Sequence, residues 1–149
     1  MAPKKTTLRV LCLHGFRSNV QVMKDQMRPL QRILGHDTEF VYLNGPFEAE
    51  GKVFPDVEEF YKDSRPFYEW TQYYIGDDKE STVLTPAQIK ELRERVGEGN
   101  HWVVRYGGME KALEYLHEKL EKLGPFDIAL GFSQGASTQT EITLALHAS

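Results

Sequence analysis

The stretch Gly131-Phe132-Ser133-Gln134-Gly135 decides the fold, because it follows an apolar run over residues 126–130 that is typical of a buried strand. A serine between two glycines at the end of a strand matches the nucleophile elbow, a sharp turn from strand into helix. The turn needs a strained backbone at the serine and flanking residues without bulk, which Gly131 and Gly135 provide. The five letters also occur by chance, and Ser133 would then be only a helix N-cap. The preceding strand favours the elbow.

The composition limits the number of domains, the classes of partner and the cellular location of the protein. The chain has 149 residues, of which 40% are hydrophobic, which predicts a single domain over residues 1–149. A net charge of −4 without a basic stripe argues against a nucleic-acid partner. No apolar run approaches the ~20 residues of a spanning helix, so we expect no membrane partner and a cytoplasmic protein that could also enter the nucleus. The single cysteine, Cys12, lies in a predicted strand and fits a reducing compartment and a place in the core.

The rest of the chain alternates strands and helices at its two ends. Residues 8–13 and 39–43 read as strands, a helix capped by Ser18 or Asn19 and ended by Gly35 lies between them, and an amphipathic helix covers residues 109–123. This order predicts an α/β fold with a parallel sheet and flanking helices. The middle, residues 46–108, is rich in aromatic and charged residues, and only a helix from Thr85 to Gly97 is predicted within it. Its aromatic residues could pack onto the sheet, wall a pocket over Ser133, or do both.

Two loops are expected to meet at one end of this sheet. Ligand sites of open parallel sheets lie beyond the carboxyl ends of the strands. If the strand over residues 8–13 lies between the other two, the loop His14-Gly15-Phe16 emerges beside the elbow. The N–H groups of Phe16 and Gln134 are then the natural donors to the oxyanion of an acyl-transfer reaction. Alternatively, residues 14–16 form an ordinary turn before a helix.

The sequence resembles the FSH family of serine hydrolases, which have the α/β-hydrolase fold. The matching stretches are residues 8–17, 42–46, 65–70, 123–127 and 131–136. The resemblance implies a carboxylic-ester hydrolase that acts on small-molecule esters without a cofactor. The histidines and acidic residues show no metal-ligand spacing, so we expect no metal site. It also implies that Ser133 is the catalytic nucleophile and that Phe16 and Gln134 hold the oxyanion.

The carboxyl-terminal segment departs from the family pattern. In α/β-hydrolases the triad acid and histidine follow the serine, but only sixteen residues follow Ser133 here. His147 stands fourteen residues beyond it, about 21 Å along a continuous helix. The run over residues 137–143 is polar where a buried helix would be apolar. We therefore expect a partial α/β-hydrolase fold without its later strands, from a truncation, an alternative reading or a degenerate copy.

An alternative function follows from this ending. A serine without its base is a weak nucleophile, so the chain could be an inactive hydrolase that binds or self-associates. Without later strands, the strand before Ser133 becomes an apolar sheet edge, which invites pairing with another chain. We therefore expect a dimer formed by strand pairing or by exchange of the carboxyl-terminal segment.

Overall fold

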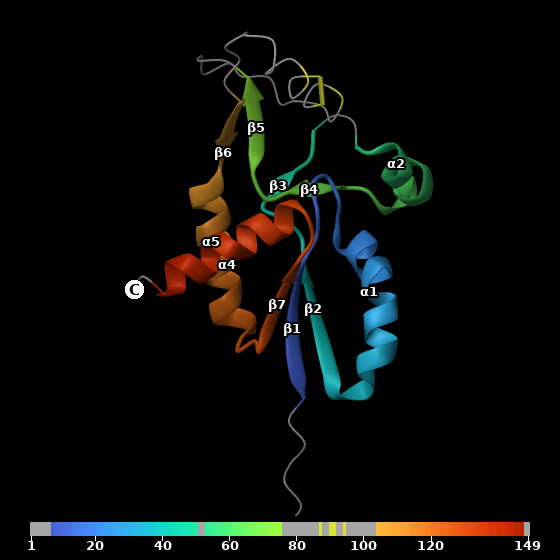
Figure 1. Cartoon of the computed structure of the whole chain (residues 1–149), viewed down its shortest axis with the longest axis vertical. Helices are drawn as coiled ribbons and strands as arrows, with labels where there is room; N and C mark the ends of the chain where they lie inside the picture. Colours follow the sequence, from blue (N-terminus) through green and yellow to red (C-terminus); the bar gives the residue numbers. More distant parts are fainter. Residues whose placement is uncertain are drawn as a thin grey trace, which may run out of the picture.

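A three-stranded parallel sheet forms the centre of the molecule (Figure 1). The computed structural model describes residues 7–50, 53–75, 87, 90–91, 94 and 104–147. The strands stand in the order β2 (Thr38–Leu43), β1 (Leu8–Leu13) and β7 (Ile128–Gly131). Leu11 of β1 lies between Val41 and Ala129. The predicted α/β class is confirmed, and β1 has the middle position on which the expected meeting of the two loops depends.

Helices cover both faces of the sheet. On one face, Val10 and Cys12 of β1 pack against Met23 and Met27 of α1 (Val20–Leu34). On the other face, alternate residues of β1 pack against Leu116 of α4 (Met109–Leu123). Helix α5 (Gln134–His147) follows β7 and lies on the same side as α4 (Figure 1). The continuous apolar run of β1 is therefore explained by burial on both faces.

The predicted boundaries agree with most observed ones. The Asn19 side chain accepts a hydrogen bond from the N–H of Val22 at 3.1 Å and caps α1, and Gly35 ends the helix with a φ of 66°. A short 3-10 turn (Gly35–Asp37) leads into β2. Strand β7 begins two residues later than predicted, at Ile128. At this point the N–H of Arg9 donates to the Asp127 carboxylate at 2.7 Å, so a side-chain oxygen takes the place of a backbone carbonyl in the pairing of the two strands.

The middle of the chain forms two small antiparallel sheets and a helix that the sequence did not predict. Strand β3 (Phe47–Glu48) pairs with β4 (Tyr68–Glu69), and β5 (Gln72–Ile75) pairs with β6 (Val104–Gly107). Between β3 and β4 lie α2 (Pro55–Tyr61) and a 3-10 turn (Lys62–Ser64). Of the helix predicted over residues 85–97, the four described residues are helical and exposed, and the others lie outside the described ranges.

Several aromatic residues of this middle segment are buried. Trp70 belongs to the same apolar cluster as Leu11 and Leu116, and Phe67 packs with Val22 and Val53. Packing of these aromatic residues onto the sheet and α1 is therefore observed. Within the described ranges, no helix is both long enough and apolar enough to cross a membrane. Burial also raises the pKa of the Cys12 thiol to about 11, as expected for a core cysteine.

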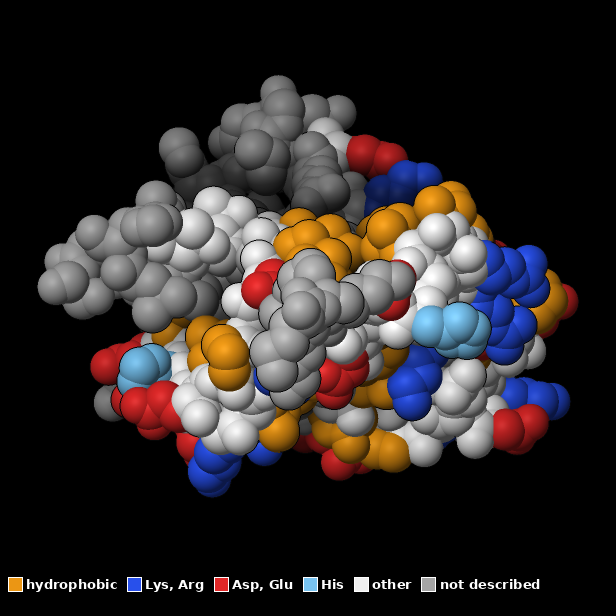
Figure 2. All heavy atoms as spheres, turned by 90° about the horizontal axis from the view of Figure 1, so that it is seen from below, with side chains coloured by type: hydrophobic (Ala, Val, Ile, Leu, Met, Phe, Trp, Pro, Cys, Tyr) orange, Lys and Arg blue, Asp and Glu red, His pale blue; other side chains and the backbone are white. Residues whose placement is uncertain are grey.

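Figure 2 shows the molecule from the end at which β1 begins, where acidic, basic and hydrophobic side chains all reach the surface. The predicted site residues lie at the other end, where β1 and β7 finish. The parallel arrangement of the strands places both loops at that end.

Candidate functional site

Ser133 occupies the turn between β7 and α5. Its φ is 52°, in the left-handed region that residues other than glycine rarely adopt, and its side chain is exposed. The turn is held by hydrogen bonds from the N–H of Gly135 to the Phe132 carbonyl oxygen at 2.9 Å and from the N–H of Ala136 to the Ser133 carbonyl oxygen at 3.0 Å. Helix α5 begins at Gln134, so the N–H of this residue stands at the helix N-terminus.

The two glycines of the turn are required by close backbone contacts. A β-carbon on Gly131 would lie 2.5 Å from the Cα of Ala136. A β-carbon on Gly135 would lie 2.5 Å from the carbonyl oxygen of His14. Any side chain at either position would force the helix away from the strands. This is the steric arrangement that the sequence predicted for the elbow.

The loop after β1 lies directly beside the turn. The N–H of Phe132 donates to the Leu13 carbonyl oxygen at 3.0 Å. The Phe132 ring covers Gly15, at which a β-carbon would come within 3.0 Å of that ring. Phe16 follows, with its ring centroid 6.2 Å from that of Phe54. The structure therefore brings Ser133, Gln134 and the Phe16 loop to one end of the sheet.

His14 is held by the backbone on both sides of its ring. Its Nδ1 is 2.7 Å from the Gly15 carbonyl oxygen, and its Nε2 accepts a hydrogen bond from the N–H of Gly45 at 2.9 Å. The ring is fully buried, and burial lowers its pKa to about 4. A neutral ring with both nitrogens engaged stabilises the loop and is not placed to accept a proton from Ser133.

The side chain of Gln134 has a position that the sequence did not predict. Its Oε1 accepts a hydrogen bond from the N–H of Trp70 at 2.9 Å. Its Nε2 donates to the carbonyl oxygen of Thr71 at 2.8 Å and to the Thr71 hydroxyl at 2.9 Å. Gln134 is 6% exposed, so these bonds are made away from solvent. The interpretation from sequence gave Gln134 only a backbone role, and nothing in residues 70–71 indicated this contact.

A buried ion pair holds the residue after Phe16. Arg17 has a left-handed φ of 46°, and its Nε donates to the Glu69 Oε1 at 2.5 Å. Both side chains are 1% exposed or less. Burial raises the pKa of Glu69, and the hydrogen bond from Arg17 opposes that rise. A buried glutamate is stable here because the guanidinium compensates its charge.

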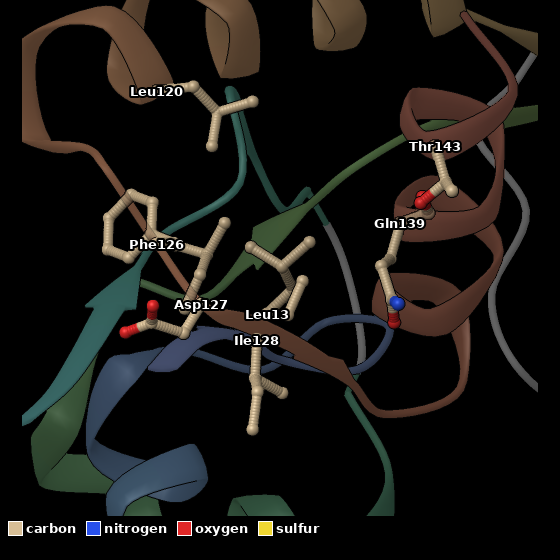
Figure 3. Close-up of a pocket in the computed structure, with 9 residues that line it drawn as sticks. Leu13, Leu120, Phe126, Asp127, Ile128, Gln139 and Thr143 are labelled. Carbon is tan, nitrogen blue, oxygen red and sulfur yellow. The ribbon is translucent and has the colours of Figure 1, made fainter. Parts of the chain in front are cut away.

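A pocket of about 180 Å³ lies between α4, α5 and β7 (Figure 3), and Ser133 is not among the residues that line it. Leu13, Leu120 and Phe126 give it apolar walls, while Gln139 and Thr143 reach it from α5. Gln139 and Thr143 belong to the polar run over residues 137–143, where a buried helix would be apolar. They line a space that apolar side chains would fill. Ile128, which also lines the pocket, is 42% exposed.

The remaining histidines with described side chains lie elsewhere. His36 precedes β2, at the amino end of the sheet, and the exposed His117 is paired with Glu121 on α4. Helix α5 is continuous from Gln134 to His147, which puts the backbone of His147 about 20 Å along the axis from the turn.

Comparison with known proteins supports one family. The model of the family described as serine hydrolase (FSH1) matches residues 1–148. The mouse esterase OVCA2 is 33% identical over 135 residues, which cover 89% of this chain and 53% of the mouse protein. The esterase FUS5 of Gibberella moniliformis is 32% identical over 136 residues, covering 91% of this chain and 48% of the fungal protein.

A plant relative extends the comparison. The rhodanese-like domain-containing protein 6 of Arabidopsis thaliana is 31% identical over 137 residues, which cover 87% of this chain and 21% of that protein. The chain thus spans about half, or less, of the length of these curated relatives. Since the family model covers nearly every residue, the chain belongs to the FSH1 family of serine hydrolases.

Proposed function

We propose that this chain carries the nucleophile and the oxyanion donors of an esterase, with Ser133 as nucleophile and the N–H groups of Phe16 and Gln134 as donors. The observation that carries the proposal is the left-handed, exposed serine at the strand-to-helix turn, beside the Phe16 loop. Relatives that are esterases support a small-molecule ester as substrate. A single domain over residues 1–149 would hold this half of the site.

The proposed chemistry is nucleophilic acyl transfer. The Ser133 oxygen forms a bond to the acyl carbon, its proton passes to a base, and the carbonyl oxygen becomes an oxyanion between the two N–H donors. Collapse of this intermediate breaks the bond to the alkoxide, which leaves with a proton, and water then hydrolyses the acyl-enzyme. The donors contribute because they are fixed in place before the charge develops. No step requires a metal or cofactor.

No histidine side chain that the structure describes is placed to act as the base. His14 is engaged with backbone groups, and His36 and His117 lie away from the turn. We therefore expect Ser133 to react slowly with strong acylating or phosphonylating agents and to turn over esters poorly, unless another segment supplies the base.

A fluorophosphonate probe tests the proposal. Attack by Ser133 forms an oxygen–phosphorus bond and expels fluoride, so the adduct is read by intact mass spectrometry. Labelling that disappears in Ser133→Ala and persists in Ser137→Ala, a serine one turn further along α5, supports the proposed nucleophile. Absence of labelling in the folded wild-type chain would refute it.

A second candidate function, self-association, is favoured by the outer edge of β7. Within the described ranges, β7 pairs only with β1, and Ile128 at its start is 42% exposed beside the pocket. An apolar edge strand with unpaired backbone groups pairs readily with another strand. We propose that two copies join at β7, either as active esterases or as the inactive alternative form.

Light scattering after size-exclusion chromatography tests this second candidate. The wild-type chain is expected to form a dimer at micromolar concentration. Ile128→Lys is expected to be a monomer, because burying the lysine charge at the interface is unfavourable. Ile33→Lys is the matched control, since Ile33 is 80% exposed on α1. A monomeric wild-type chain would contradict the candidate.

A further inference from the structure

We propose that the segment Tyr68–Thr71 is a positioning brace that fixes the N–H donors of Phe16 and Gln134 relative to each other. The inference rests on the proposed function, because it assigns residues that set the geometry of that oxyanion site. The brace is not in the turn or in the loop after β1. It reaches the site from β4 and the residues that follow it.

Three successive residues of the brace hold the loop after β1. The N–H of Tyr68 donates to the Ser18 carbonyl oxygen at 2.7 Å, and the N–H of Ser18 donates back at 3.3 Å. Glu69 accepts the buried hydrogen bond from Arg17 at 2.5 Å. The indole Nε1 of Trp70 donates to the His14 carbonyl oxygen at 2.8 Å. Phe16 is therefore flanked by fixed residues on both sides.

The other side of the brace holds the turn. Trp70 and Thr71 bind both ends of the Gln134 side-chain amide through three hydrogen bonds of 2.8–2.9 Å, two with backbone groups and one with the Thr71 hydroxyl. Trp70 thus bonds to the loop with its side chain and to the turn with its backbone. Four consecutive residues connect the two loops that carry the proposed donors.

This arrangement has a chemical consequence. An oxyanion hole lowers an activation barrier only when its donors are fixed at the position of the developing charge. The donors are backbone groups, so substitution of the Gln134 or Glu69 side chain leaves both N–H groups in the chain. A loss of reactivity in such variants would therefore show that the N–H donors have moved, because neither donor has been removed.

The first test compares Glu69→Gln and Gln134→Met with Glu118→Gln. Glu118→Gln is matched to Glu69→Gln in chemistry, but it removes an exposed pair with Lys122 on α4. Saturation kinetics with an alkyl fluorophosphonate separate the maximal rate of Ser133 labelling from the binding constant of the probe. Both brace variants are expected to lower the maximal rate about tenfold or more. The binding constant should stay within about twofold of the wild-type value.

Folding is measured on the same samples, because Glu69→Gln leaves Arg17 without a carboxylate partner. Labelling is followed at a temperature at which each variant is folded by circular dichroism. A role in stability alone would lower the unfolding midpoint and leave the maximal rate of the folded protein unchanged. That result would overturn the proposal.

The second test does not depend on reactivity. Backbone order parameters of the Phe16 and Gln134 amides are measured by nitrogen-15 relaxation. Glu69→Gln is expected to lower the order parameter at Gln134, and Gln134→Met that at Phe16, from about 0.85 toward 0.6. Changes confined to the loop nearest each substitution would overturn the brace. If the wild-type chain is not labelled but these cross effects occur, the proposed function fails and the brace stands.

Discussion

Two loop-to-helix junctions in this protein each contain one left-handed residue that is not glycine. The two residues differ in burial and in the hydrogen bonds of their side chains. Arg17, before α1, is buried, and its guanidinium is paired with Glu69. Ser133, before α5, is exposed, and its hydroxyl has no hydrogen-bond partner among the residues that the structure describes. Strain of this kind costs about 1–3 kcal/mol at each position. At Arg17 the side chain is paired in the core, whereas at Ser133 backbone hydrogen bonds hold the turn and the residue is exposed to solvent.

The helices that follow differ in the same direction. Helix α1 buries Val22, Met23 and Met27, while α5 turns polar residues such as Gln139 and Thr143 toward a pocket. Helix α1 therefore packs on the sheet through apolar residues, whereas α5 presents polar residues to the pocket. A strained residue without a structural partner is typical of a functional site. The contrast supports Ser133, and not Arg17, as the reactive position.

The largest expected change in the free energy of unfolding comes from breaking the Arg17–Glu69 pair at the junction before α1. Arg17→Gly relieves the backbone strain but leaves the buried Glu69 carboxylate without its partner. The free energy of unfolding is expected to fall by about 3–5 kcal/mol, measured by urea denaturation. Arg65→Gly removes the exposed ion pair with Glu58 and should cost no more than about 1 kcal/mol. Equal losses in the two variants would contradict the supporting role of the buried pair.

Acid is expected to weaken the first junction through His14. Its pKa is lowered from 6.5 to about 4 in the folded state. Below pH 6.5 the unfolded chain takes up a proton that the folded chain does not. Stability from this group is therefore complete above pH 6.5 and is lost as the pH falls toward 4, by about 3 kcal/mol. The difference in unfolding free energy between wild type and His14→Gln, measured across this range, should shrink accordingly; a constant difference would contradict the expectation.

The two helices should respond differently to changes on their inner faces. Met23→Ala removes a side chain that is 3% exposed on α1 and is expected to cost about 2–3 kcal/mol. Thr143→Leu places an apolar side chain at the pocket beside Leu120 and is expected to stabilise the chain by about 1 kcal/mol. Thermal unfolding of both variants measures the contrast. Destabilisation by Thr143→Leu would show that the pocket has no room for the larger side chain.

The smallest effect is expected at Ser133 itself. Glycine adopts a φ of 52° without steric cost, so Ser133→Gly should raise the free energy of unfolding by about 1 kcal/mol while removing the nucleophile. Ser133→Ala, which retains the β-carbon, is the matched control and should give little of this gain. Equal stability of the glycine and alanine variants would mean that the backbone is not strained at this position.

Much of the fold was predictable because its signals are local. The apolar run at residues 8–13, the Asn19 cap and the end of α1 at Gly35 all depend on residues close in sequence. The spacing of glycines around Ser133 likewise predicted the observed turn. The short strands β3 to β6 were not predicted, because strands of two to four residues leave no periodic pattern and depend on partners far along the chain.

The sequence by itself determined the α/β class, the turn at Ser133 and the membership of a serine hydrolase family, since each rests on contiguous residues. Only the tertiary structure decided that His14 is bound to the backbone, that Arg17 pairs with Glu69 and that Gln134 is held by Trp70 and Thr71. These contacts join residues 31 to 64 positions apart. Hydrogen bonds at such separations depend on how the chain closes in space, and no local pattern of side chains encodes them.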